Sequence, residues 1–151
     1  MEIIRNYNTD FMNKILELKL ERKINKFKNE IYFSVVENNI LYGITRLTKL
    51  EKKEIYKIED LLKDLDINPE ELSLDVYYLS GLWLDDKFSK KGIRQELSDK
   101  RIIELKNIKE DYLIVSEFNN NSTLLPYYKS ILNTINISEK GEFTNIVSSR
   151  I

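Results

Sequence analysis

A basic loop with a single glycine is the part of the sequence whose residue types most readily do chemistry. Residues 88–97 read FSKKGIRQEL, follow the apolar run VYYLSGLWL, and open a helical pattern. A glycine lets the backbone approach a ligand closely, and the first amides of a helix are unpaired and favour an anion. Lys90, Lys91 and Arg94 add positive charge. The loop therefore predicts a phosphate site on the amides of residues 90–94.

The same loop has a simpler interpretation, in which it is a solvated basic turn that only begins a helix. It matches neither GxxxxGK[ST] nor GxGxxG, which disfavours a P-loop and a dinucleotide-binding fold. Taken alone, the loop leaves both interpretations open.

Histidine and cysteine are both absent from the 151 residues. Without cysteine there is no disulfide, thiolate metal site or cysteine nucleophile. Without histidine there is no Ser-His-Asp triad, no histidine general base and hardly any zinc site. Any chemistry must therefore use carboxylates, tyrosine, lysine, backbone groups or a bound cofactor.

The composition is that of one ordinary globular domain, with 42% hydrophobic and 32% charged residues and enough length for a core. A net charge of -1 disfavours a protein that grips nucleic acid over a broad surface. No apolar run reaches the roughly 18 residues of a membrane span, and the N-terminal MEIIRNYNTD has no secretory apolar region. We therefore expect a cytoplasmic protein without a membrane segment.

Hydrophobic periodicity predicts the elements that must position the loop. We expect strands at 2–5, 31–37, 40–50, 74–84, 112–118, 134–138 and 143–150. Helices are expected from residue 8, at 93–108 and at 124–132, with a short helical pattern at 57–67. Phe11, Ile15, Leu18, Ile24 and Phe27 should form the apolar face of the first helical pattern, with a break near Leu20. Asn38-Asn39 predicts a tight hairpin turn, because asparagine tolerates positive φ. This order predicts an α/β chain with a mixed sheet and helices on its faces.

The segment LSGLWLDDKFSKKGIRQEL resembles the signature of the GNAT superfamily, the acyl-CoA-dependent N-acetyltransferases. In that pattern an apolar strand and a short turn precede Gln/Arg-x-x-Gly-x-Gly/Ala at the start of a long helix. Gly92, Ile93 and Leu97 fit the pattern. Ser89 and Arg94 depart from it, since Gln or Arg and a small residue are usual there.

A second match lies downstream, where GNAT chains carry Asn and, seven residues later, Tyr. Asn121 and Tyr128 keep this spacing, although Asn119 stands better relative to the preceding strand, and Leu132-Asn133 replaces the usual Gly-Phe. The resemblance implies a single GNAT-like domain over residues 1–151. Its central sheet should be mixed and mostly antiparallel, with helices on both faces.

The resemblance also implies acetyl-CoA as co-substrate. Its pantetheine arm would lie between the strand that ends at Leu84 and strand 112–118, pairing with the first as an added strand does. The N–H of Leu82 or Trp83 would polarise the thioester carbonyl. The implied cofactor-binding residues are Leu82, Trp83, Leu84, Ser89, Lys90, Lys91, Gly92, Ile93, Arg94 and Asn121.

The acceptor amine must lose a proton before it attacks, and a free lysine amine has a pKa of about 10.4. Without histidine, the base is either a carboxylate that acts through water or solvent itself. Ser80 stands where the family usually has a glutamate, and Glu117 is the candidate substitute. Tyr128 would stabilise the departing thiolate by a hydrogen bond. The aromatic rings of Tyr77, Tyr78 and Trp83 fit strand packing better than substrate contacts.

Three functions stay open. The first is an N-acetyltransferase acting on an amine of a small molecule, peptide or protein. The second is a catalytically silent GNAT-fold module that binds a partner, which the departures from the motifs favour. The third is an unrelated α/β protein with an incidental basic turn. The charged segment 51–70, an insertion between strands, would cover the acceptor or mediate a homodimer.

Overall fold

The computed structural model describes residues 2–6, 9–88 and 92–151, with the side chains of Thr9 and Phe88 left out. The strands are β1 (Glu2–Asn6), β2 (Asn29–Glu37), β3 (Ile40–Leu50), β4 (Asp75–Leu79), β5 (Leu82–Leu84), β6 (Tyr112–Asn119), β7 (Asn133–Lys140) and β8 (Phe143–Ser149). The α-helices are α1 (Thr9–Leu20), α2 (Glu59–Asp64), α3 (Ile93–Lys106) and α4 (Leu124–Ile131). Short 3-10 turns occupy Lys52–Ile58, Pro69–Glu71 and Asp86–Phe88.

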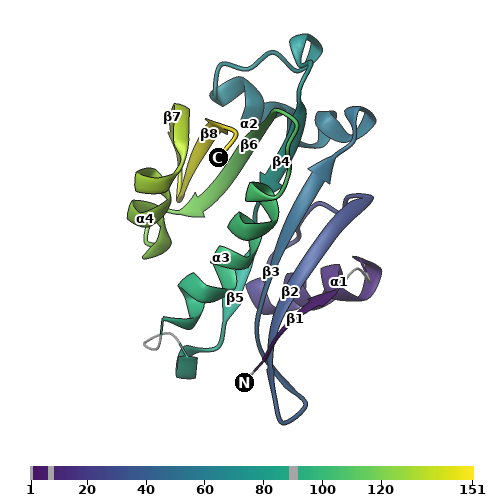
Figure 1. Ribbon diagram of the computed structural model, residues 1–151, viewed down its shortest axis with the longest axis vertical. Helices are drawn as coiled ribbons and strands as arrows, with labels where there is room; N and C mark the ends of the chain where they lie inside the picture. Colours follow the sequence, from purple (N-terminus) through teal and green to yellow (C-terminus); the bar gives the residue numbers. More distant parts are fainter. Residues whose placement is uncertain (1, 7–8, 89–91) are drawn as a thin grey trace.

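The strands form one eight-stranded sheet in the order β1-β2-β3-β4-β6-β8-β7, and β5 extends the line of β4 along β3 (Figure 1). Strands β4 and β6 run parallel, and the other described pairs are antiparallel. The expected mixed, mostly antiparallel sheet is therefore confirmed. A parallel pair needs a crossover connection, and here α3 supplies it.

Helices α3 and α4 cover one face of the sheet, while α1 and the segment after β3 cover the other (Figure 1). On the first face, Leu97 and Leu105 of α3 are fully buried. On the second, Leu16 of α1 is fully buried against Tyr32 and Ile44. Within the described residues, no helix has the length and apolar character needed to span a membrane.

The apolar face predicted for α1 is partly wrong. The helix buries Met12 and Leu16, whereas Phe11 is 61% and Leu18 77% exposed. Residues four apart share a helix face, so Met12 and Leu16 meet the sheet together, and Phe11 and Leu18 point away from it. The helix ends at Leu20, so the apolar residues beyond it pack from a coil.

The segment 51–70 is a structural cover of the sheet, although its composition is charged. Four apolar residues that recur at helical spacing pack in one core cluster with Val76, Tyr78 and Val115: Ile55, Ile58, Leu62 and Leu65. All four are buried. The segment therefore covers the part of the second face that α1 does not reach.

The hairpin between β2 and β3 turns at Asn38 and Asn39, which have φ values of 51° and 62°. Two consecutive residues at positive φ match the right-handed twist of the flanking strands. The predicted asparagine turn is therefore confirmed.

The strand predicted at 74–84 is interrupted, which corrects its expected continuity. Thr48 of β3 pairs with Tyr78, and Thr45 of β3 pairs with Leu82. The chain therefore advances four residues from Tyr78 to Leu82, while β3 advances three residues from Thr48 to Thr45. This extra residue is a β-bulge, which bends the strand and ends its regular pairing. Gly81 lies in the bulge with φ of 78°. The sequence contains this glycine, but its periodicity could not show that the pairing shifts there.

The bulge separates the two halves of the sheet. Strand β4 pairs with β6 as far as Leu79 opposite Ser116, and beyond that point β5 pairs with β3. Figure 1 shows β6 diverging from β5 below the parallel pair, with α3 crossing in front of the opening. The predicted separation of the strand that ends at Leu84 from strand 112–118 is therefore confirmed.

Candidate functional site

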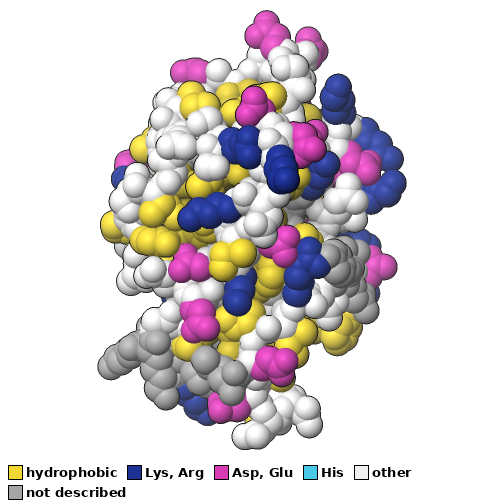
Figure 2. All heavy atoms as spheres, viewed as in Figure 1, with side chains coloured by type: hydrophobic (Ala, Val, Ile, Leu, Met, Phe, Trp, Pro, Cys, Tyr) yellow, Lys and Arg dark blue, Asp and Glu magenta, His cyan; other side chains and the backbone are white. Residues whose placement is uncertain are grey.

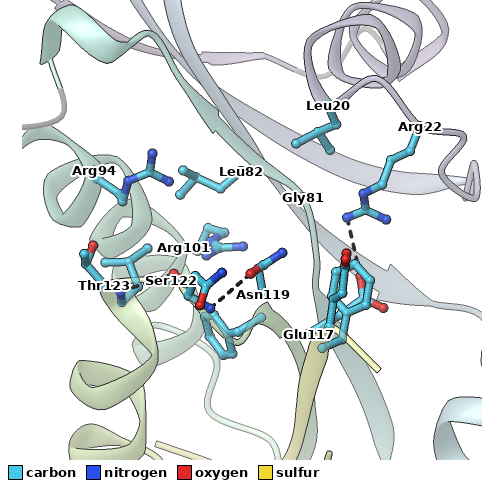
Figure 3. Close-up of a pocket in the computed structure, with 15 residues that line it drawn as sticks. Leu20, Arg22, Gly81, Leu82, Arg94, Arg101, Glu117, Asn119, Ser122 and Thr123 are labelled. Atoms are coloured by element: carbon cyan, nitrogen blue, oxygen red, sulfur yellow. Dashed lines mark hydrogen bonds and ion pairs between the residues drawn. The ribbon is translucent and has the colours of Figure 1, made fainter. Parts of the chain in front are cut away.

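A cavity of about 690 Å³ opens where β5 and β6 separate. Four of the residues predicted for the site line it: Leu82, Arg94, Glu117 and Asn121. Two arginines that the sequence did not single out, Arg22 and Arg101, line it as well (Figure 3). The cavity thus joins the bulge, α3, the end of β6 and the loop before α4 in one place.

Trp83 and Leu84, two of the three β5 residues predicted to bind the cofactor, pack in core clusters and are not among the residues that line the cavity. Trp83 packs in the core cluster of α1, with the ammonium of Lys19 4.5 Å from its ring centroid. Leu84 is buried between β2 and α3. Leu82 is the β5 side chain that lines the cavity. The predicted roles of the amides and carbonyls of these three residues stay predictions.

The bulge is held by side chains of β3 that the sequence interpretation missed. The hydroxyl of Thr45 donates to the carbonyl of Gly81 at 2.8 Å, and Nε of Arg46 donates to the carbonyl of Ser80 at 3.3 Å. A bulge interrupts the ladder and leaves such groups without a strand partner, so these donors satisfy them. Arg46 is paired with Glu30 at 2.8 Å, and both side chains are almost fully buried.

One signal in the sequence could have found Arg46. It lies inside the apolar strand ILYGITRLTKL, and arginine is rarely buried without a partner. Its register opposite Tyr32 puts it diagonally across from Glu30, which lies opposite Thr48. Identifying Glu30 as the partner of Arg46 required the register of β2 and β3, which the sequence alone did not determine.

The described part of the predicted anion site is the N-terminus of α3. Gly92 precedes the helix with φ of 70°, and no side chain caps the helix. Ile93 is buried and anchors the first turn against the core cluster of Leu84 and Leu97. Ser89, Lys90 and Lys91 lie outside the described residues, so their predicted contacts stay predictions.

Arg94 stands in the first turn of α3 and lines the cavity, where the family pattern has a small residue. Burial lowers the pKa of its guanidinium, and the negative charge of Asp86 opposes this shift. The side chain thus places positive charge beside the free amides of the helix.

Glu117 lies on the wall between the cavity and a neighbouring polar hollow, which Arg46, Tyr78 and Ser80 also line. Its carboxylate pairs with Arg22 at 3.5 Å, the contact drawn in Figure 3. Burial, with the charge of Glu117 as a second cause, raises the pKa of the Tyr78 phenol to about 12. Glu117 thus lines both spaces.

Tyr128 lies behind the cavity wall rather than in it. Its side chain is fully buried, and its hydroxyl bonds to the hydroxyl of Ser98 and lies 3.5 Å from Nη2 of Arg101. Asn121 and Asn119 both line the cavity, and the amide of Asn121 donates to the side-chain oxygen of Asn119 at 3.0 Å. The two asparagines that the sequence could not separate are therefore neighbours, with Asn119 at the end of β6 and Asn121 in the loop after it.

The surface around α3 and α4 carries both signs of charge. Figure 2 shows Lys and Arg side chains interspersed with Asp and Glu over this face, with apolar side chains between them. The arginines that line the cavity therefore do not belong to a larger basic patch on this face.

A comparison of the sequence with protein-family models and curated proteins finds no match. Solved structures match over nearly the whole chain. NAA60 of Arabidopsis thaliana, in complex with acetyl-CoA, has 12% identity and a TM-score of 0.59, covering 98% of each chain. BjaI, a CoA-dependent acyl-homoserine lactone synthase with SAM and isopentyl-CoA, has 9% identity and a TM-score of 0.63, covering 99% of this chain and 83% of that one.

A third similar structure, from Desulfovibrio desulfuricans, is assigned to the GNAT family. It has 8% identity and a TM-score of 0.53, and the match covers 98% of each chain. The TM-scores and the coverage establish a shared fold, and at identities this low they establish the fold alone. Together with the bulge and the separation of β5 from β6, they show that this chain has the fold of the GNAT acetyltransferases.

Proposed function

We propose that this protein is an N-acetyltransferase that transfers an acetyl group from acetyl-CoA to an amine of a small molecule, peptide or protein. One observation carries the proposal: strands β5 and β6 separate beside the uncapped N-terminus of a long helix. The separation leaves one edge of β5 without a strand partner among the described residues. The structures that share the fold include one in complex with acetyl-CoA.

The pyrophosphate of the cofactor would bind at the start of α3. The first amides of a helix have no partner within the helix and favour negative charge. Gly92 leaves space there, because an added Cβ would meet no atom of the described residues within 4 Å. Arg94 adds a cation from the same turn, and Ser89, Lys90 and Lys91 are proposed to complete the site.

The pantetheine arm would add to the free edge of β5 as a further strand. Its amides would pair with the backbone of Leu82, Trp83 and Leu84. The N–H of Leu82 or Trp83 would then polarise the thioester carbonyl, because a fixed donor stabilises the charge that develops on that oxygen. Thr45 and Arg46 support this geometry by holding the carbonyls of the bulge in place.

Glu117 is the proposed base, acting through water on the amine of the acceptor. Its carboxylate lies in reach of both the cavity and the polar hollow beside it. Residues of the segment 51–70 line a third space that also contains Glu117. We propose that this segment borders the acceptor, and its alternative role is contact with a second copy of the chain.

Tyr128 is the proposed donor of a hydrogen bond to the leaving thiolate. Because its hydroxyl is enclosed by Ser98 and Arg101, it must exchange its contact with Ser98 for one with the sulfur. The same enclosure favours the second candidate function, a silent GNAT-fold module. In such a module the phenol would serve packing alone.

Thermal unfolding with and without acetyl-CoA tests the proposal. At 100 times its Kd, a ligand adds about 2.7 kcal/mol of stability and raises Tm by several degrees. Gly92→Asp places a negative charge at the anion site, while Gly92→Asn is matched in shape, and both side chains tolerate positive φ. We expect the shift in the wild type and Gly92→Asn, and its loss in Gly92→Asp. The absence of any shift with millimolar acetyl-CoA would refute the proposal.

A further inference from the structure

Two arginines are almost fully buried among the described residues, Arg46 and Arg101. Arg101 is 2% exposed and belongs to α3, seven residues after Arg94. It lines the cavity, and Figure 3 shows its guanidinium in the middle of the lining residues, between Leu82 and Asn119. The cavity therefore contains a buried cation as well as the half-buried Arg94.

The contacts of Arg101 leave part of its hydrogen-bonding capacity unused. Nη1 donates to the carbonyl of Arg46 at 3.4 Å, and Nη2 donates to the hydroxyls of Ser98 at 2.9 Å and Tyr128 at 3.5 Å. Nε is buried and has no partner. All of these acceptors are neutral, whereas a guanidinium has five donors in a fork that matches a carboxylate.

No carboxylate of the described residues forms an ion pair with Arg101. Arg46 differs in this respect, because Glu30 pairs with it at 2.8 Å. Of the acids that line the same cavity, Glu117 is engaged by Arg22, and Glu142 is exposed at the turn between β7 and β8. A buried charge without a counter-ion is strongly unfavourable. An anion from outside the chain would relieve it.

The position of Arg101 separates it from the proposed phosphate site. Seven residues of helix place it roughly 10 Å along the axis from Arg94 and the first turn of α3. Its hydrogen bond to the carbonyl of Arg46 places it at the level of the bulge, since Arg46 in turn bonds to Ser80. Under the proposed function, the acyl group and the acceptor meet at this level.

We infer that Arg101 binds a carboxylate carried by one of the two substrates, and so determines which substrate the cavity accepts. The carboxylate belongs either to a dicarboxylic acyl group, as in succinyl-CoA, or to an amino-acid acceptor. The inference rests on the proposed function, which puts both substrates in this cavity. The planar fork of the guanidinium and its free Nε–H suit paired hydrogen bonds to carboxylate oxygens.

Two ligand pairs that differ in the carboxylate test the inference by isothermal titration. Succinyl-CoA is compared with butyryl-CoA, and L-alanine with L-alaninamide, the second pair both with and without acetyl-CoA. In the wild type we expect the carboxylate member of one pair to bind roughly tenfold tighter or more. The pair that shows the difference identifies the source of the carboxylate.

Arg101→Met keeps the length of the side chain and removes its charge, and Arg101→Gln is a second variant that keeps donors at the site. We expect both to abolish the difference within each pair. Equal binding of both members in the wild type, or a difference that survives in the two variants, overturns the inference. Titration with CoA that carries no acyl group tests the proposed function separately. Titration with L-alanine and L-alaninamide in the absence of CoA tests the role of Arg101 even if CoA does not bind.

The stability of the ligand-free protein provides an independent measurement. Removing an uncompensated buried charge should leave Tm of Arg101→Met unchanged or higher, whereas Arg46→Met should lower it. A fall in Arg101→Met as large as that in Arg46→Met would mean that the charge of Arg101 is already compensated within the chain. That result would also overturn the inference.

Discussion

Arg46 and Ser80 are joined across the bulge by two hydrogen bonds from one guanidinium. Nε of Arg46 donates to the carbonyl of Ser80 at 3.3 Å, and Nη2 donates to its hydroxyl at 2.9 Å. Nη1 of the same arginine pairs with Glu30 at 2.8 Å and donates to the carbonyl of Asn25. One buried side chain therefore links the bulge to β2 and to the coil after α1.

Arg46→Met should destabilise the protein strongly. The substitution leaves Glu30 charged and buried without its partner, which costs about 3–5 kcal/mol. Urea unfolding would show the loss as a lower midpoint. Adding Glu30→Gln to the variant should recover part of the stability, because the unpaired charge is then gone. An unchanged midpoint in Arg46→Met would contradict the structural role given to this pair.

Gly81→Ala should destabilise the bulge for two reasons, the positive φ at this position and the close approach of the added Cβ to Leu16. Gly81 has φ of 78°, and an added Cβ would lie 3.0 Å from Cδ2 of Leu16. A left-handed conformation costs a non-glycine residue about 1–2 kcal/mol, and the contact with Leu16 adds to this. The fall in the free energy of unfolding, measured in urea, should therefore exceed the backbone penalty alone.

Gly141→Ala is the matched control for that substitution. Gly141 has φ of 60°, but no atom in the described part of the chain lies within 4 Å of an added Cβ. It should show the backbone penalty without the contact. In a Leu16→Ala background, the extra effect at Gly81 should disappear, since a double-mutant cycle isolates the interaction of the two side chains. Equal effects of the two alanine substitutions would argue against the close contact.

Tyr128→Phe should lower kcat of acetyl transfer at least tenfold, with KM for acetyl-CoA little changed. The reason is that the hydroxyl would act on the thiolate as it leaves, and a single general acid or base contributes about 100-fold or more. Steady-state kinetics with an accepted amine would measure both constants. Ser98→Ala is the control, because it frees the hydroxyl from its partner and should retain kcat. Wild-type kcat in Tyr128→Phe would support the silent packing role instead.

Stability should fall at alkaline pH, and Tyr78 should account for part of the fall. Burial, followed by the charge of Glu117, raises the pKa of Tyr78 from 10.0 to about 12. Folding therefore favours the neutral phenol. Its contribution is complete below pH 10 and is lost as the pH rises from 10 to 12. In this window the loss approaches ~1.4 kcal/mol per pH unit for one group.

Tyr78→Phe should make the free energy of unfolding less dependent on pH between 10 and 12. Urea unfolding at several pH values, compared with the wild type, measures this slope. Tyr32 provides an internal reference, because burial and Glu30 raise its pKa to about 12 as well, so part of the slope should persist. Identical slopes in the two proteins would show that Tyr78 ionises normally.

The sequence determined most of the elements, because their signals are local. The asparagines of the first hairpin adopt the positive φ that their short polar side chains tolerate. Gly92 stands where the chain turns into α3. The apolar run 112–118 became β6, the strand parallel to β4, as a strand buried on both faces should be. These features depend on neighbours in the chain, so composition and spacing suffice to predict them.

Tertiary structure decided which residues meet in the site. The bulge depends on how β3 pairs with β4 and β5, and Arg46 holds it from a strand about 35 residues earlier in the chain. Arg101 reads in the sequence as one more charged residue of a helix. Only the packing of α3 over the sheet buries it beside a cavity, where no carboxylate of the described residues forms an ion pair with it. Burial and counter-ions are properties of distant contacts, which no local pattern specifies.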